Sequence, residues 1–224
     1  MKSVSILKFL FAAALGAALL HSANNLAATM VIQDDVVIEG DVDIEESLTV
    51  DGSASVGSSA TALGSNSMAI GFMTETGTWG TYSLAVGGET IATGWGNIAV
   101  GDLTMTSHTA SAAFGNWTLA AGTAAFTAGQ GSEATGSQSA AFGRDTLAES
   151  VASIAVGRYN TGGAVGGSWQ WNEEDPVFEI GIGENDSNRA NAMTVYKSGD
   201  AEFAGVVRIQ PAGDISMGQF TSEP

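Results

Sequence analysis

The sequence predicts an all-β protein whose main part is a parallel β-roll, a solenoid of about seven short coils. Three observations support this prediction. Glycine recurs at a fixed step of 14 residues, with a single step of 16. A pentapeptide, Ser/Asn-x-Ala-aliphatic/Phe-Gly, recurs in the same phase. A second half-motif, Gly-x4-Ala-x-Gly, fills the rest of each unit. A fixed period of this kind is the sequence signature of a solenoid.

Charge and composition exclude several classes of function. The 224 residues include 24 acidic and 7 basic side chains, so the net charge is −17. Nucleic acid and an anionic membrane surface are excluded as partners, because this charge repels both. The absence of Cys excludes disulfides, thiolate nucleophiles and Cys-ligated zinc. Only two His are available for acid/base chemistry near neutral pH. We therefore expect a protein that is not an enzyme.

Residues 1–28 have the features of a secretory signal peptide. Lys2 and Lys8 precede an apolar run of 12 residues at 9–20, and small residues follow it. This run is too short to span a bilayer comfortably, since about 20 residues are needed. We expect no membrane span after cleavage. The mature chain is then exported to the medium or the cell surface, with the periplasm as the alternative.

Residues 29–56 form an acidic segment with strict alternation. Apolar side chains stand at even positions from Ile32 to Val56, and Asp or Glu occupies many odd positions between Asp35 and Asp51. This pattern predicts a half-buried strand or a short solenoid with an acidic outer face. Charges on an exposed edge discourage strand addition, so this segment is expected to protect the start of the stack.

Residues 57–160 carry the roll itself. Each unit holds two strand-like pieces and two turns marked by glycine, and the two extra residues of the longer step enlarge one turn within 72–86. The closing glycines are Gly57, Gly71, Gly87, Gly101, Gly115, Gly129, Gly143 and Gly157. Alternation sends the pentapeptide alanines to one face and larger apolar residues to the other. A roll has one interior, so the second apolar face predicts self-association of several copies.

The pentapeptides carry a resemblance to a known family. SMAIG (67–71), SLAVG (83–87) and SIAVG (153–157) belong to seven units in register. They resemble the head repeats of trimeric autotransporter adhesins, the YadA-like or haemagglutinin-type 14-residue repeat, over about residues 53–160. The resemblance implies a left-handed β-roll, a homotrimer, and a structural or adhesive function with an extracellular matrix protein or a glycan as partner. With neither a heptad run nor a barrel segment in the sequence, a head without stalk and membrane anchor is expected.

Residues 161–210 predict a small C-terminal β-meander. The repeat register is lost after Gly157, and residues 158–175 are rich in turn formers. Strand patterns follow at 177–183 and 192–197, and a Ser-Gly-Asp turn leads to a further strand pattern at 201–209. The stretch 175–200 resembles an adaptor module found after head-type repeats. Residues 211–224 form a tail.

Trp169 and Trp171 are the candidate binding residues. Together with Trp79, Trp95 and Trp117 they could stack on sugar rings, which gives a carbohydrate-binding solenoid as the alternative function. They could equally close the open end of the roll, and we favour this second role because large aromatics bury much area.

Three further patterns suggest chemistry less strongly. Adjacent carboxylates at 34/35, 45/46 and 173–175 point to opposite faces of a strand, so we interpret them as solvated acidic surface. No metal or other cofactor is expected; Ca²⁺ at residues 184–188, or at Asp41 and Asp43, is the alternative. His108 replaces a turn glycine and is expected to be exposed.

A column of hydroxyl residues raises a third function, ice binding. It lies three residues after each closing glycine and comprises Ala60, Thr74, Thr90, Thr104, Thr118, Ser132 and Thr146. The companion column two residues later is mostly Ala rather than Thr. We therefore rank ice binding below the other two functions, and an ordinary hydroxyl ladder suffices.

Overall fold

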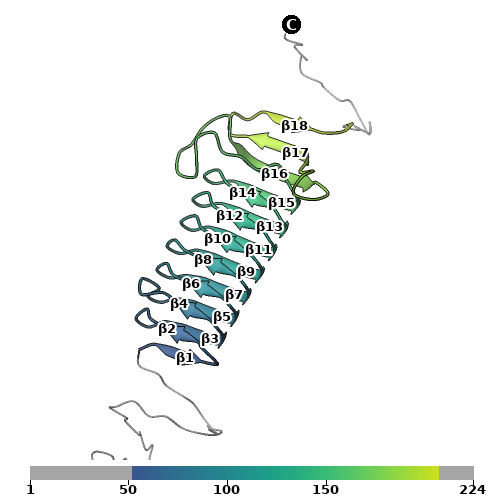
Figure 1. The fold of residues 1–224 in the computed structure, drawn as a ribbon. Helices are drawn as coiled ribbons and strands as arrows, with labels where there is room; N and C mark the ends of the chain where they lie inside the picture. The colour runs from purple at the N-terminus through teal and green to yellow at the C-terminus, as the bar shows by residue number, and fades with distance from the viewer. Residues whose placement is uncertain (1–51, 207–224) are drawn as a thin grey trace, which may run out of the picture. The chain divides into compact units, whose positions relative to one another are not determined.

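The computed structural model describes residues 52–206, which lie in the compact unit beginning at Val50. The expected signal peptide, nearly all of the acidic segment and the C-terminal tail are outside these residues. The described part is all-β, without a helix, and forms a β-solenoid of about eight turns (Figure 1). Because no helix occurs between residues 52 and 206, none there could cross a membrane.

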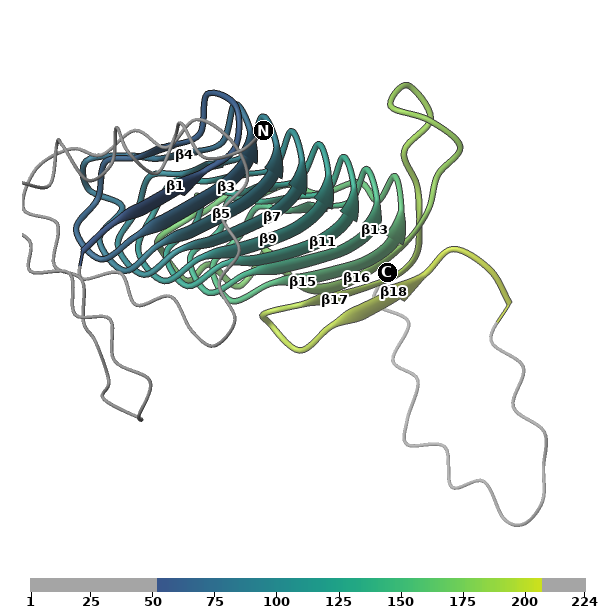
Figure 2. The same ribbon diagram turned by 90° about the horizontal axis from the view of Figure 1, so that it is seen from below.

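Two sheets make the solenoid. The wider sheet contains β1 (Ala54–Val56), β3 (Met68–Phe72), β5 (Leu84–Gly88), β7 (Ile98–Asp102), β9 (Ala112–Asn116), β11 (Phe126–Gln130), β13 (Ala140–Arg144) and β15 (Ile154–Arg158). The narrower sheet contains β2 (Thr61–Ala62), β4 (Glu75–Thr76), β6 (Ile91–Ala92), β8 (Met105–Thr106), β10 (Leu119–Ala120), β12 (Glu133–Ala134) and β14 (Leu147–Ala148). Neighbouring strands among these are parallel, and Figure 2 shows the turns of successive coils aligned along each edge.

Equivalent repeat positions stack on one another. Ala113 of β9 pairs with Ala99 of β7 on one side and with Thr127 of β11 on the other. The pentapeptide alanines are completely buried, as the alternation predicted: Ala69, Ala85, Ala99, Ala113, Ala141 and Ala155. The facing positions of the narrower sheet are also buried and small, for example Thr106 and Ala120. The interior is therefore a narrow core of small side chains that brings the two sheets close together.

Glycine is required at the closing position of each coil for steric reasons. At Gly101 φ is +140°, a conformation that L side chains rarely adopt. A Cβ added there would overlap the carbonyl oxygen of Gly115 in the next coil. Glycine at this position thus permits both the left-handed backbone and the close approach of successive coils.

The two extra residues of the longer step enlarge a turn, as predicted. They lie between β4 and β5, where the amide N of Gly80 donates to the carbonyl of Gly77 at 2.7 Å. Met68 still pairs with Leu84, so the ladder is undisturbed and the additional length bulges at the edge of the roll (Figure 1).

The C-terminal end differs from the expectation. The expected strands are present as β16 (Pro176–Ile182), β17 (Asn191–Tyr196) and β18 (Ala201–Phe203). However, β16 runs parallel to β15, with Gly157 opposite Gly181, so it continues the wider sheet instead of beginning a separate one. The prediction that the register ends at Gly157 is wrong: 24 residues instead of 14 separate Gly157 from Gly181, and the ten extra residues lie in the loop before β16. β17 and β18 then add antiparallel to the end of the sheet.

Candidate functional site

The two candidate tryptophans lie on the surface. Trp169 and Trp171 belong to the loop between β15 and β16, and their exposed fractions are 60% and 61%. The favoured prediction that they plug the end of the roll is wrong, because β16, β17 and β18 cover that end instead. The ring of Trp169 lies 5.8 Å from the ring of His108, which is exposed as expected. Trp171 lies over the ammonium of Lys197, with 5.0 Å between the Nζ and the ring centroid.

A buried ion pair fixes this loop. Asp175 Oδ2 lies 3.3 Å from Lys197 Nζ, and both side chains are fully buried. Asp175 Oδ1 accepts hydrogen bonds from the amides of Val165 and Gly166. Asp175 was expected on a solvated acidic surface with its two neighbouring glutamates, and for Asp175 this is wrong: its cation comes from β17, distant in the sequence. The two glutamates, Glu173 and Glu174, are exposed as expected.

Glu179 occupies the column that alanine fills in most other coils. It pairs with Ala155 in the register of β15 and β16 and is buried. Its Oε2 accepts from Asn160 Nδ2 at 2.7 Å, and its Oε1 accepts from Thr161 Oγ1 at 3.0 Å and from Asn191 Nδ2 at 2.6 Å. Both oxygens are therefore occupied by hydrogen bonds from neutral groups, as a buried carboxylate requires.

Asn160 closes the edge of the narrower sheet. Its Oδ1 accepts from the amide of Leu147 at 2.7 Å, and its Nδ2 donates to the carbonyl of Leu147 at 2.8 Å. The side-chain amide thus hydrogen bonds β14 as a further strand would. Sequence reasoning missed Asn160, Glu179 and Lys197. Glu179 could have been identified, because it is the one charged residue in the otherwise apolar strand pattern VFEIGIG.

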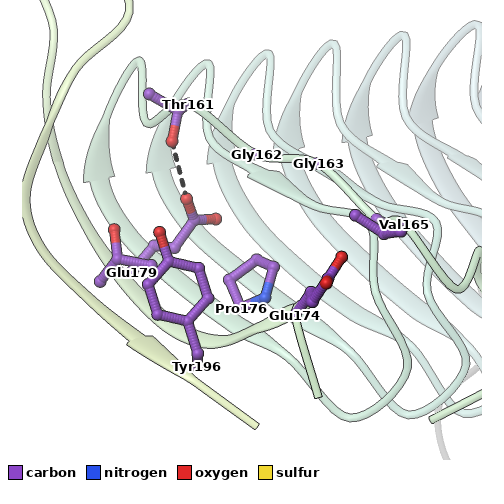
Figure 3. A pocket seen from close by; sticks show the side chains of 10 residues that line it. Thr161, Gly162, Gly163, Val165, Glu174, Pro176, Glu179 and Tyr196 are labelled. Atoms are coloured by element: carbon purple, nitrogen blue, oxygen red, sulfur yellow. Dashed lines mark hydrogen bonds between the residues drawn. The ribbon is translucent and has the colours of Figure 1, made fainter. Parts of the chain in front are cut away.

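A cavity of about 260 Å³ opens beside this cluster (Figure 3). Thr161, Pro176, Glu179 and Tyr196 lie around it. The Tyr196 hydroxyl donates to Glu202 Oε2 at 3.0 Å, and this hydrogen bond raises the pKa of Tyr196 above its usual 10. The phenol therefore stays a proton donor at neutral pH. Since the polar groups around Glu179 already satisfy one another, this cluster forms the end cap of the roll, and Glu174 is the other carboxylate that lines the cavity.

The alternative Ca²⁺ ligands at 184–188 form a turn. Asn185 Oδ1 accepts from the amides of Ser187 and Asn188, and Asp186 Oδ1 lies 2.6 Å from Arg189 Nη2. Within residues 52–206 no group of three His, Cys, Asp or Glu side chains could hold a metal ion. Asp41, Asp43 and the carboxylate pairs at 34/35 and 45/46 lie outside the described residues.

The hydroxyl column faces inward. Thr74, Thr90, Thr104, Thr118, Ser132 and Thr146 are all buried. Ice binding, which we rank below the other two functions, would need this column on an outer face, whereas the repeat places it in the interior of the narrow core. Buried hydroxyls cannot meet an ice surface, so this column does not support ice binding.

The outer face of the wider sheet is an uninterrupted apolar surface, called here the apolar face. One column comprises Met68, Leu84, Ile98, Ala112, Phe126, Ala140, Ile154 and Phe178, and the other Ile70, Val86, Val100, Phe114, Ala128, Phe142, Val156 and Ile180. Every member is partly or well exposed. Phe126 lies between Phe114 and Phe142, with ring centroids 5.6 and 5.3 Å apart.

The fold defines the chain as a β-solenoid protein with an apolar face and a polar end cap. No protein-family model matches the sequence, and no curated protein matches it.

Proposed function

We propose that the chain is an exported, non-enzymatic homotrimer of left-handed β-rolls with 14-residue coils, serving a structural or adhesive role at the cell surface or in the extracellular space. The single observation that carries the proposal is the apolar face. It runs over β1 to β16 without a polar residue in either column. A monomeric soluble protein rarely exposes an apolar patch of this extent, whereas subunit interfaces bury such patches.

Three copies on one axis would cover the apolar faces symmetrically. A closed cyclic arrangement buries the same surface on every subunit and leaves no copy uncovered. The resemblance of the pentapeptides to YadA-like head repeats supports the trimer over a dimer, and it also supports surface attachment, with a matrix protein or a glycan as partner. The net charge of −17 opposes association, so the apolar contact must exceed that repulsion.

The oligomeric state tests the proposal. We expect the chain without residues 1–28 to sediment at micromolar concentration with three times the monomer mass. Phe126→Asp places a charge in the middle of the apolar face, so it should shift the protein towards monomer, because an unpaired charge at an interface core is costly. Ser58→Asp, at an exposed turn, is the matched control and should leave the mass unchanged. A stable monomer of the unsubstituted protein would overturn the proposal.

A further inference from the structure

One edge of the solenoid presents aromatic side chains to solvent. This aromatic edge consists of Trp79, Tyr82, Trp95 and His108, in the turns that join the narrower sheet to the next strand of the wider sheet, together with Trp169. The exposed fractions are 82% for Trp79 and 53% for Trp95. Tyr82 and Trp95, in consecutive coils, have ring centroids 6.0 Å apart at an interplanar angle of 84°.

The loop between β15 and β16 extends the same edge. The carbonyl of Ser168 accepts a hydrogen bond from the amide of Ser137, in a turn of this edge, at 2.8 Å. That contact places Trp169 so that its ring reaches His108, two coils nearer to the N-terminus. Thus Trp79, Tyr82, Trp95, His108 and Trp169 form one series along the stack.

The backbone beneath the rings is a continuous ladder. The amide of Gly96 donates to the carbonyl of Thr81 at 2.9 Å, and the amide of Ala110 donates to the carbonyl of Trp95 at 2.8 Å. The next turn repeats the pattern between Ala124 and Thr109 at 2.9 Å. The rings are therefore held on hydrogen-bonded turns spaced by the strand separation, about 4.8 Å. A ligand that binds them loses little free energy to ordering the protein.

Most turns of the aromatic edge carry no formal charge, although the chain is strongly acidic. The turn residues 78–82, 93–96, 107–110, 121–124 and 135–138 contain no Asp, Glu, Lys or Arg, but many Thr, Ser and Gly. The next turn holds Glu149, whose Oε2 accepts a hydrogen bond from the amide of Gly163. The opposite edge holds Glu89, Asp102, Arg144, Asp145 and Arg158. A surface of aromatic rings and hydroxyls with little charge is complementary to a neutral, hydroxyl-rich chain.

We infer that the aromatic edge binds a linear neutral polysaccharide lying along the solenoid axis. Aromatic rings pack against the apolar faces of sugar rings, and the Thr and Ser hydroxyls of the turns exchange hydrogen bonds with the sugar hydroxyls. This inference names the partner of the attachment role and rests on the proposed function. The site lies within a single chain, however, so its test is separate from the test of the trimer.

Binding to defined neutral polysaccharides tests the inference. The chain without residues 1–28 is mixed with cellulose, chitin and soluble mixed-linkage β-glucan, and the bound fraction is measured. We expect Tyr82→Ala, Trp95→Ala and Trp169→Ala each to weaken binding about tenfold, the loss typical of an aromatic anchor. The control is Trp117→Ala, which removes a tryptophan with an exposed fraction of 64% from the opposite edge and should bind normally.

Folding and assembly are measured on the same variants. Thermal melting and sedimentation should match the unsubstituted protein, and Trp95→Tyr should retain most of the binding because it keeps an aromatic ring. The inference is overturned if none of the three polysaccharides binds, or if Trp117→Ala weakens binding as much as the edge variants do. It is also overturned if the edge substitutions abolish binding of a matrix protein instead of a polysaccharide. A lower sedimenting mass of the edge variants would overturn it as well, since the edge would then be a subunit contact.

Discussion

At the scale of single residues, the repeat is constrained by backbone more than by side chains. Gly101 adopts a positive φ and lies against the carbonyl of Gly115, whereas Gly96, also at positive φ, has open space where a Cβ would stand. Gly101 therefore combines a clash between coils with a more strained φ of +140°, whereas Gly96 has only a φ of +68°.

Gly101→Ala should destabilise the protein more than Gly96→Ala. A non-glycine residue at positive φ costs about 1–2 kcal/mol, and only Gly101→Ala adds a clash with the next coil. We expect a loss of about 1 kcal/mol for Gly96→Ala and at least about 3 kcal/mol for Gly101→Ala. Urea unfolding measures both. Equal losses would show that the coils can separate to admit a methyl group.

Thr104 tests the role of the inward hydroxyl column. Its Oγ1 is buried without a hydrogen-bond partner among the described residues, and an unsatisfied buried hydroxyl costs about 1–3 kcal/mol. Thr104→Val replaces that hydroxyl by a methyl group and should raise the free energy of unfolding by about 1 kcal/mol. Thermal melting measures the change. A lower melting temperature would mean that the hydroxyl is satisfied in solution.

At the scale of elements, the sequence predicted the strands better than their partners. The pentapeptide identified most strands of the wider sheet, and alternation separated their alanines from the larger apolar side chains. The continuation of the ladder through β16 escaped prediction because Glu179 replaces the alanine that marks the motif. The groups that satisfy Glu179, Asn160 and Asn191, are distant in sequence and carry no pattern of their own.

The ion pair between Asp175 and Lys197 should be essential to the loop between β15 and β16. Lys197→Met leaves a fully buried carboxylate without its cation, which costs about 3–5 kcal/mol. We expect a lower melting temperature and faster proteolysis within residues 161–174. The double variant Asp175→Asn, Lys197→Met removes both charges and should recover most of the stability. If Lys197→Met alone melts like the unsubstituted protein, the pair is dispensable.

At the scale of the whole molecule, stability comes from repetition. With a core of Ala, Ser and Thr, each coil buries little apolar area, so stacking of the coils supplies most of the stability. In the proposed trimer, covering of the apolar face adds to it. The roll and its second apolar face could be predicted because both are periodic. Trp79, Trp95 and Trp169 are sequence candidates for sugar stacking, but their place on one edge could not be predicted, since they stand at irregular intervals.

The enlarged turn between β4 and β5 has a consequence for how such a protein can change. Two additional residues leave Met68 opposite Leu84, and the much longer insertion before β16 leaves Gly157 opposite Gly181. Chain length at the edges is thus uncoupled from the ladder that holds the coils. A peptide grafted into either place would be displayed outward without a shift of strand register. The solenoid is therefore a scaffold whose edge loops can vary in sequence and length while its strand ladders stay constant.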